Sequence, residues 1–308
     1  MTENKKLTPE EKWESLTLAN NFIFYKVMRH HPDACQHLIE LLLGIKIEKI
    51  EMANEETIFI DHDSRGIRLD VFVKDTNKIF DVEMQVKDTK DLPERSRYYQ
   101  GVMDIDSLGD GQGFHELKNS HVIFICLADI FHNNLPVCTF ENICIEDGKT
   151  KLNDRAYKHF FIAKNCVKMI ENKEIREFFE FLISNKTSAG FTSELGTYVN
   201  DAKHNTQWRM QYMTWERWQA YARDEGIQEA KITSAKSFLR MNVLSPEQIA
   251  ECTSLTLEQV LELKEEISKE KLSVYSANFL FNTKSAHNRQ SFFASKVIKY
   301  KYQRNYGF

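Results

Sequence analysis

The chain has 308 residues, a formal net charge of −4 and a hydrophobic content of 42%. This length accommodates one large domain or two smaller ones, and the apolar content is sufficient for a packed core. The weakly negative charge gives no general affinity for nucleic acid, and the 12% aromatic content argues against a disordered chain.

Neither a membrane segment nor a zinc-binding cysteine pair is expected. The N-terminal stretch MTENKKLTPEEKWES is polar, and no apolar run of about 18 residues follows it. None of the six cysteines has CxxC spacing with another, so reduced, buried thiols are the better interpretation. We therefore expect a soluble, cytoplasmic protein that does not associate with membranes.

The first predicted element is helical and covers residues 17–43. Apolar residues recur there at helical spacing, Pro32 interrupts the pattern and Gly44 ends it. Three stretches that are typical of strands follow, namely ETIFIDH at 56–62, IRLDVFVK at 67–74 and KIFDVEMQV at 78–86. The short turn DTN joins the last two, which predicts a hairpin.

A second helix is predicted to begin near Leu92, with Pro93 in its first turn, and to end at GDGQG. The run HVIFICLADIF at 121–131 is almost wholly apolar, as in a central strand that is covered on both faces. The order helix, three strands, helix, strand predicts a compact α/β unit.

From about Tyr157 onward the pattern is helical and more charged. Trp208, Tyr212 and Trp215 follow helical spacing, and such an aromatic stripe usually packs against a core. Two short helices begin with capping-box patterns, SPEQ at 245–248 and TLEQ at 256–259. We predict a core at 1–155, a helical region with a helix-turn-helix-like pair at 156–270, and a basic, aromatic tail at 271–308.

The stretch IFDVEMQV carries polar side chains on one face of a predicted strand. Asp81, which is nearer the turn, is expected to be exposed to solvent, and Glu83 and Gln85 follow it on the same face. Across the hairpin, Asp70 is a carboxylate within a hydrophobic strand and is expected to pair beside Glu83. Two buried carboxylates repel each other unless a cation lies between them, and Mg²⁺ prefers such oxygen ligands.

A structural explanation competes with the metal site. Acidic residues in strands are often solvated edge residues or ion-pair partners, and the alternation alone favours that interpretation. Histidines add little, because no histidine pair has ligand spacing with a carboxylate in a regular element.

The segments RGIRLDVFVKDTNKIFDVEMQ and LPERSRYYQGVMDIDSLGDGQGFHELKNSHVIFICLADIF resemble the PD-(D/E)XK nuclease family transposases, also called the Rpn family. The resemblance is close over residues 18–150 and looser as far as Leu263. It implies a restriction-endonuclease-like α/β core with the order αβββαβ, a mixed sheet flanked by helices and an α-helical C-terminal region. It also implies metal-dependent hydrolysis of DNA phosphodiesters.

Carried over by position, Asp70 matches the metal-binding Asp of the family motif and Glu83 its second acid. Gln85 occupies the position where the wider superfamily usually has Lys, and it is expected to be catalytic by orienting a water or by hydrogen-bonding a phosphate oxygen. Glu40 corresponds to an acid of the first helix. The resemblance also assigns the backbone carbonyl of Met84 to the metal, with Mg²⁺ as the expected ion and Mn²⁺ as the alternative. Two departures are Leu69 in place of the motif's Pro, and Gln85 itself, which removes a positive charge.

Arg95 and Tyr99 are one helical turn apart and share a face of the second helix. Beside a metal–phosphate site, Arg95 would bind a phosphate oxygen or act in the second shell. The alternative, equally weighted, is a structural pairing of Arg95 with Glu83 or a backbone carbonyl.

The favoured function is a metal-dependent DNA endonuclease of low sequence specificity, linked to recombination or DNA mobility. A catalytically inactive nuclease-fold protein that binds DNA or regulates is the alternative. A DNA-reading helix-turn-helix is disfavoured, because its second helix carries four glutamates that phosphates would repel. Self-association into a homodimer or a higher homo-oligomer through the C-terminal helices fits better. The tail is expected to be an unfolded extension, with single-stranded nucleic-acid binding as the alternative.

Overall fold

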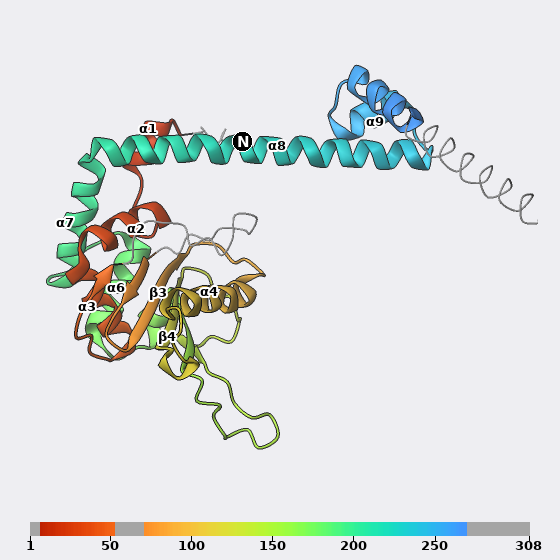
Figure 1. Cartoon of the computed structure of the whole chain (residues 1–308). Coiled ribbons are helices and arrows are strands. Elements are labelled where there is room, and N and C mark those ends of the chain that lie inside the picture. Colours follow the sequence, from red (N-terminus) through yellow and green to blue (C-terminus); the bar gives the residue numbers. More distant parts are fainter. Residues whose placement is uncertain (1–6, 53–70, 270–308) are drawn as a thin grey trace, which may run out of the picture. The chain divides into compact units, whose positions relative to one another are not determined.

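The computed structural model describes residues 7–52 and 71–269, which form a mixed α/β structure (Figure 1). The described strands build one six-stranded sheet in the order β1-β2-β3-β4-β6-β5. They are β1 (Glu51–Met52), β2 (Val71–Lys74), β3 (Lys78–Gln85), β4 (Asn119–Cys126), β5 (Val137–Phe140) and β6 (Ala156–Ile162).

Helices precede, separate and follow these strands. They are α1 (Pro9–Glu14), α2 (Asn21–His30), α3 (Pro32–Leu43), α4 (Leu92–Ser107), α5 (Ala163–Met169), α6 (Lys173–Ser184), α7 (Phe191–His204), α8 (Thr206–Met241) and α9 (Pro246–Thr253). A 3₁₀ turn covers Phe114–Glu116, and a further helix spans 257–269. No helix among the described residues is both long enough and apolar enough to cross a lipid bilayer.

The first predicted helix is present but divided at Pro32. Because proline lacks an N–H group, it is tolerated in the first turn of α3 and not inside a continuous helix. Gly44 ends α3 with φ of 64°, a left-handed conformation that glycine adopts without steric cost. The predicted break and stop are therefore both confirmed.

The predicted hairpin is also confirmed in its described part. Strands β2 and β3 pair antiparallel, with Val71 opposite Val82 and Lys74 opposite Ile79. On its other side β3 pairs parallel with β4, so β3 lies between two neighbours and is covered along both edges. The predicted strand at 56–62 lies outside the described residues.

Each face of the sheet has its own apolar core. Side chains such as Phe80, Val82 and Met84 pack with α2, α3 and α6 on one face. On the opposite face, Phe72 and Phe124 pack with α4 through residues that include Tyr99. Alternate residues of β3 therefore enter different cores, as the period of two in a strand requires.

The prediction of helix from about Tyr157 is wrong for the segment that forms β6. This strand pairs parallel with β4 and antiparallel with β5. Phe160, Phe161 and Ile162 are all buried, so both faces of its C-terminal half are covered and the polar–apolar alternation is lost. The sheet continues past residue 155, where the sequence predicted the core to end.

The chain divides into two compact units, residues 1–214 and 215–308. The described part of the second unit contains residues 215–241 of α8, helix α9 and the helix at 257–269. Their shared core comprises Ala235, Ile249, Leu255, Val260 and Leu263. Both predicted capping boxes are confirmed, because Ser245 and Gln248 exchange side-chain-to-backbone hydrogen bonds and Thr256 and Gln259 do the same. The predicted basic tail lies outside the described residues.

Candidate active site

The polar face of β3 is buried. The exposed fractions of Asp81, Glu83 and Gln85 are 0%, 3% and 7%. The expectation that Asp81 is exposed is wrong, because its face of β3 is covered by the α4 side of the core and Phe72 stands opposite it in the ladder. Burying carboxylates is costly unless charge or hydrogen bonds compensate, so this face requires a local explanation.

Helix α4 supplies the compensating groups. Its first residue, Leu92, is fully buried in the core between α4 and the sheet, which anchors the start of the helix near the end of β3. Arg95 and Tyr99 lie one turn apart and face the strand, because side chains at i and i+4 share a helix face. The predicted placement of these two residues on one face is thus observed.

Arg95 contacts three residues of the site, namely Glu83, Gln85 and Tyr99. Its Nη2 lies 3.4 Å from Glu83 Oε2, and its Nη1 donates to Gln85 Oε1 at 3.2 Å. The Nε and Nη2 atoms also donate to the hydroxyl of Tyr99, at 3.3 and 3.0 Å. The guanidinium therefore joins two polar residues of β3 to its own helix.

The amide of Gln85 is engaged at both ends. Its oxygen accepts from Arg95, while its Nε2 donates to the backbone carbonyl of Lys87 and to Thr89 Oγ1, the latter at 3.3 Å. These bonds fix the orientation of the amide, because only one orientation supplies an acceptor to Arg95 and a donor to the loop. The observed contacts make Gln85 a residue that positions Arg95.

Burial and nearby charges keep Arg95 and Tyr99 each in one protonation state. Burial raises the pKa of Tyr99 to about 12, and the nearby charge of Glu83 acts in the same direction. The phenol therefore stays protonated at neutral pH. Burial opposes the charge of Arg95, but the hydrogen bond to Tyr99 and the negative charge of Glu83 outweigh it, and the pKa of Arg95 is raised.

Glu40 lies in a different environment. Its carboxylate accepts from the backbone N–H of Ile47 at 2.8 Å and pairs with Lys46 at 3.1 Å. The bond from Ile47 is the main reason that the pKa of Glu40 is lowered. Helix α3, which carries Glu40, packs in the core on the side of the sheet opposite to Arg95. Its described contacts close the turn after α3 and do not join it to Glu83.

Asp70 and Met84 are the two remaining residues of the predicted metal site. Asp70 lies outside the described residues, but its neighbour Val71 is paired with Val82, the neighbour of Glu83. Met84 is described, and its side chain is buried in the core on the opposite face of β3.

The donor chemistry of the described site fits a hard divalent ion. Carboxylate and carbonyl oxygens, which Glu83 and Met84 offer, are the ligands that Mg²⁺ and Mn²⁺ prefer. Among residues 7–52 and 71–269, no group of three His, Cys, Asp or Glu side chains gathers around one point. The further ligand that the sequence predicts, Asp70, lies outside this part of the chain.

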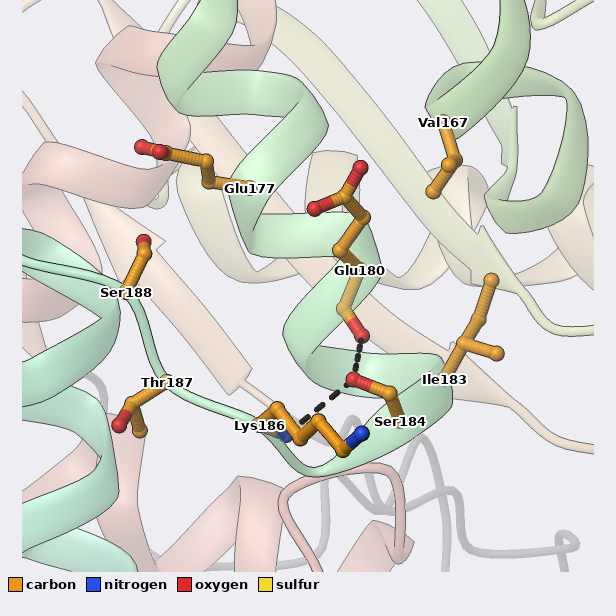
Figure 2. A pocket seen from close by; sticks show the side chains of 8 residues that line it. All are labelled: Val167, Glu177, Glu180, Ile183, Ser184, Lys186, Thr187 and Ser188. Carbon is orange, nitrogen blue, oxygen red and sulfur yellow. Dashed lines mark hydrogen bonds between the residues drawn. The ribbon is translucent and has the colours of Figure 1, made fainter.

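A shallow hollow beside α6 does not belong to this site (Figure 2). Ser184 Oγ donates to the carbonyl of Glu180 at 2.8 Å and accepts from the backbone N–H of Lys186 at 3.2 Å. These bonds serve the end of the helix. The hollow is lined by Val167, Glu177, Glu180, Ile183, Ser184, Lys186, Thr187 and Ser188, and none of the predicted site residues is among them.

Sequence reasoning missed the burial of Asp81 and the contact that Thr89 makes with Gln85. Asp81 shares the alternation of Glu83 and Gln85, so the signal for its burial was present in the pattern. Thr89 stands in the loop before α4, and no local pattern indicated its bond to Gln85. Such a contact depends on how the loop folds back over the end of β3.

Comparison with known proteins gives one match. A model of the family described as PD-(D/E)XK nuclease family transposase matches residues 21–235, which include β3, α4 and most of α8. No curated protein matches the chain, and no solved structure does.

Proposed function

Because the chain belongs to the PD-(D/E)XK nuclease family transposases, we propose that it is a metal-dependent DNA endonuclease of low sequence specificity. Nucleases of this superfamily generally use divalent metal ions. The observation that supports the proposal is the meeting of Glu83, Gln85 and Arg95 at the buried end of β3. Here a carboxylate and a cation share one site, as phosphodiester hydrolysis requires.

In the proposed site, Asp70, Glu83 and the backbone carbonyl of Met84 hold the ion. When bound, a divalent ion lowers the pKa of a coordinated water and offsets negative charge on the phosphate. Mg²⁺ is the proposed ion and Mn²⁺ the alternative, because both accept oxygen ligands. Glu40 is omitted from the proposed ligand set, since Ile47 and Lys46 already engage its carboxylate.

Arg95 is proposed to bind a non-bridging oxygen of the phosphate. Its side chain is 30% exposed while that of Glu83 is 5% exposed, so the guanidinium lies between the buried acid and solvent. A planar guanidinium can contact two phosphate oxygens at once. Arg95 would thereby supply the positive charge that is missing at Gln85, and Gln85 and Tyr99 would hold it in place.

DNA is the proposed substrate, with weak sequence preference, because the described site contains no element that is shaped to contact base edges. Cleavage of both strands of a duplex calls for two sites, which a homodimer formed through the C-terminal helices would provide. A link to recombination or DNA mobility follows from the family and is part of the proposal.

Cleavage of supercoiled plasmid tests this function. With Mg²⁺ the protein should nick the plasmid, and EDTA should abolish nicking. Asp70→Ala and Glu83→Gln should each lower the rate by about 10²-fold or more, the scale for loss of a key electrostatic contact. Glu40→Gln is the matched control and should retain activity, since it replaces a carboxylate outside the proposed ligand set.

In the alternative, the chain is a catalytically inactive protein with a nuclease fold that binds DNA or has a regulatory role. Absence of metal-dependent nicking by the unaltered protein with either Mg²⁺ or Mn²⁺ would favour this alternative. If Glu40→Gln and Glu83→Gln lowered the rate of nicking equally, the result would contradict the proposed ligand set.

A further inference from the structure

Helix α8 contains a long segment whose side chains are exposed within the described part of the chain. Every residue from 217 to 230 is exposed, although the segment includes bulky apolar groups. Trp218 is 70% exposed and Tyr221 is 63% exposed. Tertiary packing normally provides most of the stability of a helix, and exposed apolar groups in such a segment indicate an interaction surface.

Three of the exposed apolar residues of α8 follow a regular spacing. Met210, Tyr221 and Ile232 are separated by 11 residues each, which is about three helical turns with a drift of only about 20°. Their exposed fractions are 71%, 63% and 36%. Four polar residues lie in the same sector of about 80°. Together these residues form what we call the α8 stripe: Met210, Thr214, Arg217, Tyr221, Glu225, Gln228 and Ile232.

We propose that the α8 stripe binds the same stripe of a second copy, with the helices antiparallel and a two-fold axis at Tyr221. In this register Met210 packs on the partner's Ile232, and Thr214 meets the partner's Gln228. Arg217 faces the partner's Glu225, and the two-fold axis repeats this ion pair. Tyr221 packs on the partner's Tyr221. Apolar, polar and charged positions are each matched with a suitable partner, as an isologous interface requires.

The charges select this orientation over the parallel one. Parallel helices in register would bring Arg217 against the partner's Arg217 and Glu225 against the partner's Glu225, and like charges in contact are unfavourable. Antiparallel pairing converts both repulsions into attractions. Within the described residues no ion pair joins Arg217 or Glu225 to another side chain, so both are available to a partner.

A second copy suits this surface better than DNA or a membrane. Residues 217–230 contain two basic side chains, Arg217 and Arg223, and three acidic ones, Asp224, Glu225 and Glu229. This balance is unfavourable toward phosphates of DNA and toward anionic lipid surfaces. A self-complementary surface has no such penalty.

The pairing specifies the contact for the homodimer that we proposed for duplex cleavage, and it can be tested without any cleavage assay. The mass of the full chain is measured by sedimentation equilibrium over a range of concentrations. The unaltered chain should be dimeric. Arg217→Glu and Glu225→Arg should each weaken association by about tenfold or more, because each change creates two like-charge contacts across the two-fold axis.

The double variant R217E/E225R restores opposite charges and should recover the dimer. Recovery separates a direct contact from a folding defect, since two damaging changes would otherwise add. Arg223→Glu is the matched control, because Arg223 is exposed on the opposite side of α8 and should leave the mass unchanged.

A cysteine at the axis provides an independent measurement. In a Cys252→Ser background, which removes an exposed thiol, Tyr221→Cys should form a disulfide-linked dimer on mild oxidation, whereas Arg223→Cys should not. A monomeric mass for the unaltered chain at all concentrations would overturn the proposal, as would a double variant no stronger than the single ones. These results would indicate that another segment of the chain or a different protein covers the stripe.

Discussion

Strand β3 and helix α8 depart from the usual distribution of side chains in opposite directions. In β3 three polar residues, Asp81, Glu83 and Gln85, are almost completely buried. In α8 two large aromatic residues, Trp218 and Tyr221, are mostly exposed. Buried polar groups and exposed apolar surfaces are the informative exceptions in a folded protein, so each region indicates a function.

The two exceptions have different physical costs. A buried carboxylate loses hydration and requires compensation inside the fold, here from Arg95 for Glu83. An exposed aromatic side chain loses nothing on folding but leaves the free energy of its burial unused until a partner arrives. The β3 site should therefore depend on the packing around it, and the α8 stripe should not.

Truncation of one aromatic side chain in each region gives the largest contrast. Phe80→Ala removes a fully buried ring of β3, on the face of the sheet opposite to Arg95, and should lower the free energy of unfolding by about 3–5 kcal/mol. Trp218→Ala should change it by no more than about 0.5 kcal/mol. Chemical denaturation at low protein concentration measures both without a contribution from association.

Similar losses in the two variants would contradict the comparison. They would mean that Trp218 is buried within the single chain. Met103→Ala, in the core on the other face of the sheet, is a second buried control and should resemble Phe80→Ala in direction.

A smaller effect is expected when the Tyr99 hydroxyl, which accepts hydrogen bonds from Arg95, is removed. Tyr99→Phe keeps the buried ring and removes the acceptor of two hydrogen bonds from the guanidinium. We expect the rate of plasmid nicking to fall about tenfold, which corresponds to about 1.4 kcal/mol in the activation barrier. The matched control is Tyr98→Phe, because Tyr98 is adjacent in sequence but 43% exposed.

The two tyrosine variants should melt at similar temperatures. If Tyr99→Phe nicks DNA at the unaltered rate, Arg95 does not need this contact for its proposed role. If Tyr98→Phe loses as much activity as Tyr99→Phe, the effect does not arise from the geometry of the β3 site.

The smallest effect concerns pH. His121 and His159 lie on neighbouring strands with ring nitrogens 3.1 Å apart, and Thr139 contacts the other nitrogen of His159. Burial lowers the pKa of His121 from 6.5 to about 3 and that of His159 to about 4. In the unfolded chain both would titrate near 6.5. Between about pH 4 and 6.5 the unfolded state therefore binds more protons, and stability should decrease as the pH falls through this window.

Chemical denaturation at pH 7, 6 and 5 tests this dependence. His121→Asn should flatten the slope of stability against pH by about one proton, whatever its effect on stability at pH 7. His132→Asn is the control, because His132 is exposed and should leave the slope unchanged. An identical slope in all three proteins would show that the half-buried pair of His121 and His159 does not govern the acid response.

Local patterns were sufficient wherever neighbours in the chain decide the structure. The stop at Gly44, the hairpin between β2 and β3, and both capping boxes depend on a few adjacent residues, and the structure has each of them. The alternation in β3 likewise placed Glu83 and Gln85 on one face. The spacing of Arg95 and Tyr99 placed them together on the next helix.

Distant contacts decided what the patterns could not. β6 was missed because neighbouring elements cover both faces of its C-terminal half and remove the periodic contrast that identifies a strand. Asp81 is buried because α4 and β2 cover it, although its polarity suggested exposure. Gln85 orients Arg95 because a loop and a helix meet at the end of β3.

The sequence by itself therefore determined the elements with a clear local pattern, the family and the residue types that could carry the chemistry. Only the tertiary structure decided which of these residues meet, because strand pairing and helix packing bring together side chains whose separation in the chain has no local signal. Helix α8 illustrates both parts: the helical spacing of Trp208, Tyr212 and Trp215 is visible in the sequence, and the exposure of residues 217–230 is visible only in the fold.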